Sequence, residues 1–306
     1  MPKFGAGAQV RGSGTWPGCA VLTRKLGGRP EGTAVYMTSW LLIEQPGPWA
    51  PDALEPVLAK AFGGRPIPAS MRALLIRRPG KHQRTAGPRT VYVASGLPGN
   101  RWLERLEVDD LTELADLDLT GVAHGRAGHG EAVEGPLFLI CTHGAKDMCC
   151  AVLGRPLAAS LGESHPDRTW EVSHVGGDRW AGNLLVVPDG YLHGQVDADE
   201  AALVAKAALG GQVYAERLRG RTSARDSWAQ CAEIAVRRQT GLRALDAVIA
   251  LKQQNLTATS RLVTVRAGED RYAVRVALRP RDHSEDTRCQ DRLNLSEYVV
   301  DELRRI

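Results

Sequence analysis

Three of the chain's six cysteines lie within ten residues, in the segment CTHGAKDMCC at 141–150. Thiolate sulfur and imidazole nitrogen are ligands that favour zinc, copper and iron–sulfur clusters over hard cations. The segment follows the apolar run PLFLI at 136–140, so we expect it to form a loop at the end of a buried strand. Loops at strand ends present side chains to clefts, which makes these cysteines candidates for a metal or redox centre.

A second segment, SHVGGDRW at 173–180, is the best candidate for the remaining ligands of such a centre. In it, three residues separate His174 from Asp178, and Gly176 and Gly177 lie between them. Glycine adopts backbone conformations that other residues avoid, so this pair allows the chain to curl around a bound group.

The spacing of the cysteines leaves four interpretations open. Cys149 and Cys150 are packing residues in the first, since an unpaired cysteine is often buried. A zinc site would normally contain a C-x₂-C pair, which this segment lacks. A thiol–disulfide centre would normally contain C-x-x-C, and vicinal cysteines are a poor substitute for it. A mixed cysteine and histidine set fits a Rieske-type iron–sulfur centre best.

Composition restricts the class of protein. The 306 residues are 43% apolar and 24% charged, with a mean hydropathy of −0.24, as in globular proteins of up to two domains. A net charge of +4 and 5% aromatic residues give no support for nucleic-acid binding. No run of 18 apolar residues and no signal peptide is apparent, so we expect no membrane contact and a cytoplasmic location. In a reducing compartment such as the cytoplasm, we expect the cysteines to be free thiols or metal ligands rather than to form disulfides.

The order of predicted strands and helices divides the chain into five parts. One α/β unit precedes the Gly- and His-rich stretch VAHGRAGHGEAVEG, and another follows it. We expect helices at 110–119, 151–162 and 227–253, and hairpins around Asp189-Gly190 and at 261–280. The parts are a flexible leader at 1–15, an N-terminal α/β domain at 16–121, a linker at 122–135, a second α/β domain at 136–215, and a C-terminal helix plus β-hairpin extension at 216–306.

The two segments with ligand-type residues also belong to longer recognisable motifs. CTHGAKDMCCAVLGRPLA followed by WEVSHVGGDRWAGNLLVVPDG resembles the sucrase/ferredoxin-like family. Agreement extends to GTAVYMTSWLLIEQPGPW, RALLIRRPG and LRGRTSARD…AEIAVRRQTG, and covers the chain from Cys19 to Leu245. The resemblance implies an α/β fold in which 136–215 is a thioredoxin-like ferredoxin domain, with an N-terminal α/β domain and a C-terminal α+β extension. It also implies a 2Fe–2S cluster with two cysteine and two histidine ligands, the histidines in the pattern H-x-G-G-H.

Carried over by position, the resemblance places three cluster ligands at Cys141, Cys150 and His174. The family's second histidine falls on Asp178, whose carboxylate can also ligate iron. An anionic oxygen in place of a neutral imidazole would lower the reduction potential of the cluster. The alternatives are that Cys149 or His193 supplies the fourth ligand, or that the cluster is labile or lost.

Other residues near the two segments have weaker assignments. Arg179 and Asn183 are expected to form a salt bridge and a turn hydrogen bond, or to donate hydrogen bonds to cluster sulfurs. The residues expected beside the cluster without ligating it are His143, Gly176, Gly177, Arg179 and Asn183. Lys146 and Asp147 belong either to a docking face or to a solvated loop. The scattered cysteines, expected to be single structural or surface thiols, are Cys19, Cys231 and Cys289.

The sequence therefore favours an electron-transfer protein with one 2Fe–2S cluster and a redox partner protein, either a reductase or an acceptor. A redox enzyme or sensor that uses an exchangeable oxygen-ligated iron is one alternative. A zinc-bearing or cluster-free interaction module is another. Sucrose hydrolysis has no support, because no pair of carboxylates can be placed at a glycosidic distance. The C-terminal extension could bind a partner or form a homodimer.

Overall fold

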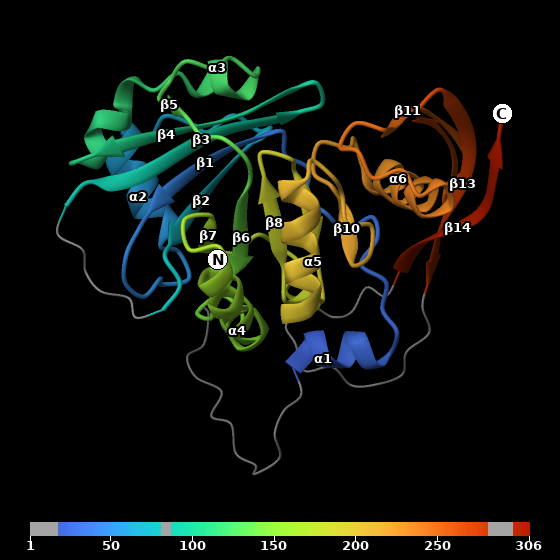
Figure 1. The fold of residues 1–306 in the computed structure, drawn as a ribbon, viewed down its shortest axis with the longest axis horizontal. Helices are drawn as coiled ribbons and strands as arrows, with labels where there is room; N and C mark the ends of the chain where they lie inside the picture. The colour runs from blue at the N-terminus through green and yellow to red at the C-terminus, as the bar shows by residue number, and fades with distance from the viewer. Residues whose placement is uncertain (1–17, 81–86, 281–295) are drawn as a thin grey trace, which may run out of the picture.

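The computed structural model describes residues 18–80, 87–280 and 296–306. The expected leader at 1–15 and Cys289 lie outside these residues. The described chain forms a ten-stranded mixed sheet and a separate four-stranded antiparallel sheet, with helices packed against both (Figure 1). This is the α/β class that the sequence predicts.

The large sheet contains both predicted α/β units. Its strands are β1 (Ser39–Glu44), β2 (Met71–Arg77), β3 (Arg89–Leu97), β4 (Asn100–Val108), β5 (Glu131–Ala132), β6 (Leu137–Cys141), β7 (Thr169–Val172), β8 (Leu184–Val187), β9 (Tyr191–His193) and β10 (Leu218–Arg221). Across the sheet they lie in the order β10-β9-β8-β6-β7-β2-β1-β3-β4-β5. The units join where β2 pairs antiparallel with β7, Ile76 opposite Val172. The predicted linker and extension each contribute an edge strand, β5 and β10.

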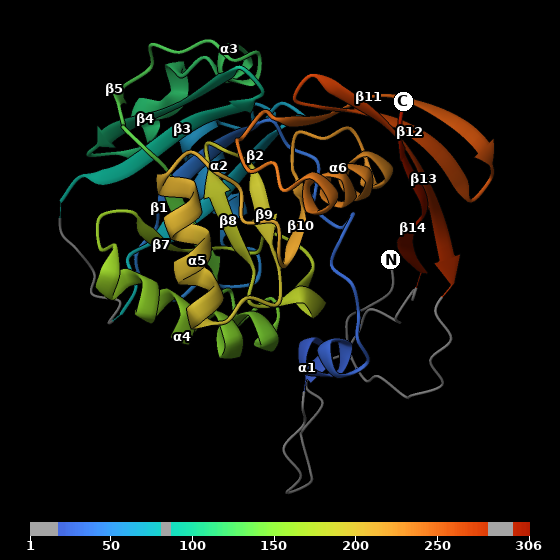
Figure 2. The same ribbon diagram turned by 45° about the vertical axis from the view of Figure 1, so that its right-hand side comes forward.

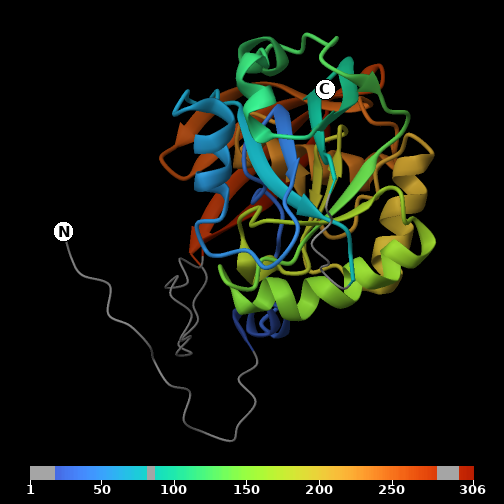
Figure 3. The same cartoon turned by 90° about the vertical axis from the view of Figure 1, so that its left-hand side faces the viewer.

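The helices cover the faces and one end of this sheet (Figures 1 and 3). They are α1 (Gly18–Lys25), α2 (Leu54–Phe62), the 3₁₀-helix η1 (Leu111–Asp116), α3 (Leu119–Ala123), α4 (Met148–Ser164), the 3₁₀-helix η2 (Asp178–Trp180), α5 (Ala198–Leu209) and α6 (Ser227–Thr240). None of the helices that the structure describes is long and apolar enough to span a membrane. The predicted helix at 110–119 is divided into η1 and α3, and the Asp110 side chain caps η1.

The second α/β unit has a thioredoxin-like arrangement, as the resemblance implies. In it β6 and β7 are parallel, whereas β8 is antiparallel to both β6 and β9. Alternate residues of β6 face opposite sides of the sheet. Phe138 and Ile140 pack with α4 and α5, while Leu139 and Cys141 face the other core.

The start of α4 differs from the sequence prediction and matters for the cysteines. The helix begins at Met148 rather than at 151, because the Asp147 side chain accepts a hydrogen bond from the Cys149 amide at 2.7 Å. Cys149 and Cys150 therefore lie in the first turn of a 17-residue helix instead of in the preceding loop. The positive end of the helix dipole favours thiolates at these positions.

The C-terminal extension folds against α6. Its strands are β11 (Val248–Thr257), β12 (Ser260–Ala267), β13 (Asp270–Pro280) and β14 (Ser296–Arg305). They curve around α6 in Figure 2, and the predicted hairpin at 261–280 is confirmed as β12 and β13. The predicted helix at 227–253 is wrong at its end. Gly241 adopts φ +69° and caps α6 after Thr240, and Val248 then pairs with Ala267 in the sheet.

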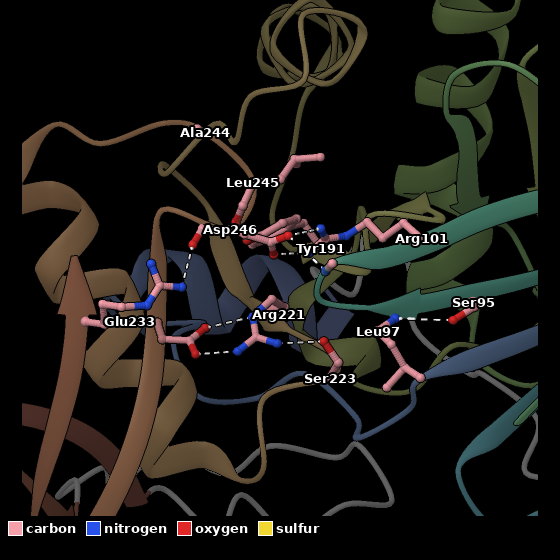
Figure 4. A network of polar contacts seen from close by, with 12 residues as sticks. Ser95, Leu97, Arg101, Tyr191, Arg221, Ser223, Glu233, Ala244, Leu245 and Asp246 are labelled. Carbon is pink, nitrogen blue, oxygen red and sulfur yellow. Dashed lines mark hydrogen bonds and ion pairs between the residues drawn. The ribbon is translucent and has the colours of Figure 1, made fainter. Parts of the chain in front are cut away.

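A polar network joins this extension to the large sheet (Figure 4). Arg101 of β4 donates two hydrogen bonds of 2.7 Å to the Asp246 carboxylate. Arg221 of β10 pairs with Glu233 of α6, and both side chains are buried. The Tyr191 hydroxyl of β9 donates to the Leu245 carbonyl at 2.7 Å. The edge of the sheet formed by β9 and β10 is therefore held in place by α6 and the segment that follows it.

Candidate metal centre

Cys141, Cys150 and His174 meet at the end of the large sheet. Cys141 ends β6, His174 lies two residues beyond β7, and these two strands are parallel neighbours, so their carboxyl ends coincide. Cys150 reaches the same point from the first turn of α4. The potential ligand atoms of the three residues all lie within 4.8 Å of one another, and Cys150 Sγ is 3.8 Å from His174 Nδ1.

The two thiols of this group are in contact, and this contact shifts their pKa values in opposite directions. The hydrogen bond from Cys150, and secondarily the one from His174, hold the pKa of Cys141 well below its usual value. The same contact with Cys141, together with burial, raises the pKa of Cys150. The lowered pKa of Cys141 favours its thiolate, which is the form of cysteine that ligates metals.

A buried arginine lies beside the two cysteines. Arg219 of β10 is 1% exposed, and its Nη1 donates to Gly176 O and Asn183 Oδ1, both at 2.8 Å. Its other hydrogen bonds go to the side chain and carbonyl of Thr33. All these acceptors are neutral, and within the described parts of the chain Arg219 forms no ion pair.

Arg219 remains a cation in this position. Burial lowers its pKa to about 10, and the negative charges of Cys141, Cys150 and Asp178 oppose that change. A buried charge without a charged partner destabilises the fold, so an anion at the two cysteines would stabilise the Arg219 guanidinium. The sequence analysis missed Arg219. Its only signal was a place in the motif LRGRTSARD, which says nothing of where β10 lies.

Gly177 of the 173–180 segment makes room for this arginine, and Gly176 accepts a hydrogen bond from it. Gly176 and Gly177 have φ values of +88° and +75°. A Cβ atom at Gly177 would overlap the Arg219 guanidinium. Asn183 completes the contact, since its Nδ2 donates to Gly177 O at 2.9 Å while its Oδ1 accepts from Arg219. The glycines and Asn183 are thus close to the centre, as expected, and they position Arg219.

His143 supports His174 through the backbone. Its Nδ1 accepts from the His174 amide at 3.3 Å, so the opposite nitrogen, Nε2, carries the proton and donates to Ala50 O at 3.0 Å. Burial lowers the pKa of His143, which keeps the ring neutral and able to make both contacts. His143 therefore lies beside the candidate ligands without joining them, as the sequence predicts.

The candidates for a fourth ligand lie outside this three-residue group. Asp178 Oδ2 is 3.8 Å from Cys19 Sγ, and burial followed by contact with Asp147 raises the pKa of its carboxyl. Cys149 Sγ is 3.6 Å from Cys19 Sγ. His193 is buried and contacts Tyr214 O through Nε2 at 3.0 Å. The identity of the fourth ligand stays a prediction. Arg179 is partly exposed and has no ion pair within the described residues.

A second group of possible ligands lies next to the first. Cys19 in α1, together with Asp147 and Cys149 at the start of α4, has its ligand atoms within 4.8 Å of one another. Helix α1 packs against α4 and η2 on the side away from the sheet (Figure 2). No local pattern predicts this approach, because 130 residues separate Cys19 from Cys149.

A family model described as sucrase/ferredoxin-like matches residues 30–220. The chain belongs to this family. The matched residues include all three members of the first group and Arg219, whereas Cys19 precedes them. No curated protein and no solved structure matches the chain significantly. Membership in the sucrase/ferredoxin-like family agrees with a site whose two thiols and one imidazole are suited to a soft metal or an iron–sulfur cluster.

Proposed function

We propose that the protein is an electron carrier that holds one 2Fe–2S cluster through Cys141, Cys150 and His174, with Asp178 as the fourth ligand expected from the sequence. The observation that carries the proposal is the burial of Arg219 beside the two cysteines with neutral hydrogen-bond acceptors only. A 2Fe–2S cluster held by these two thiolates would become more negative by one charge on reduction, and the buried guanidinium of Arg219 would offset the added charge.

When bound, a 2Fe–2S cluster stores and releases one electron. The residues of this chain set the conditions for that change. Arg219 offsets the negative charge that reduction adds, and burial away from water strengthens its effect. His143 and Asn183 fix the loop that carries His174 and Gly177, so the surroundings change little between the two charge states.

Apolar side chains next to the site are exposed. Met148 and Val152 of α4 are 70% and 61% exposed, and Tyr36 is 49% exposed. Val35 lies against Gly176, which places Tyr36 near the loop that carries His174. His174 is itself partly exposed. We propose that this apolar edge docks a redox partner protein, because exposed apolar patches commonly mark interaction surfaces.

A cytoplasmic location is part of the same proposal. The five cysteines that the structure describes form no disulfide. Reduced thiols of this kind suit a reducing compartment, where iron–sulfur ligands remain available.

The test is spectroscopy on protein purified without oxygen. The expected result is iron and acid-labile sulfide in equal amounts, visible absorption that bleaches with dithionite, and an electron paramagnetic resonance signal on reduction. Cys141→Ser and Cys150→Ser should lose the cluster. Cys231→Ser is the matched control, since Cys231 is equally buried but packs between α6 and the second sheet. Colourless protein that takes up zinc and no iron, even after reconstitution with iron and sulfide, would refute the proposal.

A further inference from the structure

The Cys19, Cys149 and Asp147 group is separate from the three proposed cluster ligands. Cys19 and Cys149 are buried in a small core with Ala20 and Ala181, whereas Cys141 and Cys150 belong to the core of the large sheet. Asp147 is partly exposed at the N-terminus of α4. The three donors come from two helices that are distant in sequence.

The distance between the two sulfur atoms is typical of metal ligands. Cys19 Sγ and Cys149 Sγ are 3.6 Å apart. Sulfur atoms in a disulfide are about 2.05 Å apart. Two thiolates on one tetrahedral metal ion, each at about 2.3 Å, are separated by about 3.8 Å. The observed separation fits a direct thiol–thiol contact, and it also fits two neighbouring corners of a tetrahedral site.

The backbone around this pair is adapted to the approach. Gly18 has φ +68°, and a Cβ atom there would lie 2.9 Å from Cys149 Sγ. The Ala20 amide donates a hydrogen bond to the Cys149 sulfur. Asp147 Oδ1 accepts from the Cys149 amide, which holds the carboxylate beside the two sulfur atoms. Such supporting hydrogen bonds are usual around bound metals.

Two acidic side chains lie beside the Cys19–Cys149 pair, and a cation would stabilise them. Asp147 and Asp178 are in contact, and Asp178 Oδ2 is 3.8 Å from Cys19 Sγ. Neither carboxylate forms an ion pair with a lysine or arginine of the described chain. Two carboxyl groups and two thiols thus surround one small volume. A divalent cation would bind the two thiols and Asp147, with Asp178 left to the proposed cluster. Thiolates select a soft or borderline ion over calcium or magnesium.

We propose that Cys19, Cys149 and Asp147 bind a zinc-type divalent cation at a second metal site, distinct from the proposed cluster. The site ties α1 to α4 and η2. It does not require the cluster, and it uses a cysteine outside the matched family region. Binding releases the two thiol protons to solvent, and the two thiolates then neutralise the cation, with the carboxylate as a third donor.

The test uses the full chain, reduced and freed of metal, with Zn²⁺ and Co²⁺ as probes. We expect Co²⁺ to give a sulfur-to-metal charge-transfer band and the visible bands of tetrahedral cobalt, and Zn²⁺ to displace it. Cys19→Ser and Cys149→Ser should each lose one bound equivalent relative to the wild type. Gly18→Ala keeps every donor but should weaken binding roughly tenfold, about 1.4 kcal/mol. Cys231→Ser is the control, and circular dichroism checks the folding of each variant.

The outcomes separate this site from the cluster. Loss of the zinc equivalent in Cys19→Ser, with iron content and visible spectrum unchanged after reconstitution, supports the proposal. If the family site takes no iron, it also binds the probe, and two equivalents should fall to one. Retention of every equivalent in Cys19→Ser would overturn the proposal. So would loss of the iron chromophore with the zinc retained, or thiol labelling that finds Cys19 and Cys149 joined in a disulfide.

Discussion

The close packing of α4 on β6 predicts how a substitution in α4 changes both stability and metal binding. Gly154 of α4 lies directly against the end of β6, and a Cβ atom at this position would be 2.1 Å from the Cys141 carbonyl oxygen. Real Cβ contacts exceed 3.0 Å, so in Gly154→Ala the helix and the strand must separate by about 1 Å. Cys141 lies on the strand and Cys150 on the helix, so this separation also opens the candidate metal centre.

Two opposing effects determine how much Gly154→Ala changes the free energy of unfolding. Overpacking of this kind costs about 1–3 kcal/mol, and the upper value applies because the obstacle is a backbone carbonyl rather than a flexible side chain. Alanine regains about 1 kcal/mol over glycine inside a helix. We therefore expect Gly154→Ala to lower the free energy of unfolding by about 2 kcal/mol.

Gly162 provides a matched control on the same helix. Its added Cβ would meet only the Pro79 ring, at 3.3 Å, and a small adjustment relieves this contact. Gly162→Ala should therefore be stabilised by up to about 1 kcal/mol. Urea denaturation of both variants under reducing conditions measures the difference, and metal analysis should show lower iron occupancy in Gly154→Ala alone. Equal stability and equal iron content in the two variants would refute the close packing of α4 on Cys141.

Three further predictions concern charge and ligation. Arg219→Gln should lower the reduction potential of the cluster by roughly 50–100 mV, since a unit charge in a partly buried site contributes about 1–2 kcal/mol. Redox titration measures this shift. Arg219→Lys keeps the positive charge and should recover most of the potential, and a failure to do so would contradict the prediction. If Asp178 ligates the cluster, Asp178→His should retain it with a higher potential and Asp178→Ala should bind iron weakly, whereas identical spectra in wild type and Asp178→Ala would exclude Asp178. Burial lowers the pKa of His193 to about 4, against about 6.5 in the unfolded chain. As the pH falls, His193 is therefore protonated in the unfolded chain before it is protonated in the folded protein. Stability should fall by up to about 3 kcal/mol as the pH drops from about 6.5 to 4, and the pH slope of urea denaturation should be flatter in His193→Gln.

The elements of the large sheet were predictable where a strand is a short apolar run bounded by turn residues. β1, β6 and β8 are examples, since each is almost wholly buried. The end of α6 and the start of β11 were not predictable in this way, because ALDAVIALKQQ also fits helical spacing. The pairing of Val248 with Ala267 decides for a strand, and that contact exists only once the hairpin has folded.

The candidate site was predictable to the extent that its residues are close in sequence or end neighbouring strands. Cys141 and His174 end parallel strands, so their meeting follows from the topology. Arg219 and Cys19 could not be placed, because each reaches the site from an element whose packing leaves no local signal. Arg219 comes from an edge strand of the sheet, and Cys19 from an eight-residue helix far from the other candidate ligands in sequence.

Two unusual features of the sequence have a common explanation in this geometry. The chain carries Cys149 beside the expected ligand Cys150, and it carries Asp178 where the resemblance implies a histidine. The structure brings these two residues together at Cys19, which is 3.6 Å from one and 3.8 Å from the other. An imidazole at 178 would add a neutral group to a place where two thiols and Asp147 meet, whereas a carboxylate adds a second anion. The additional thiol and the additional carboxyl group therefore lie on either side of Cys19, where the proposed cluster and the proposed second metal site adjoin.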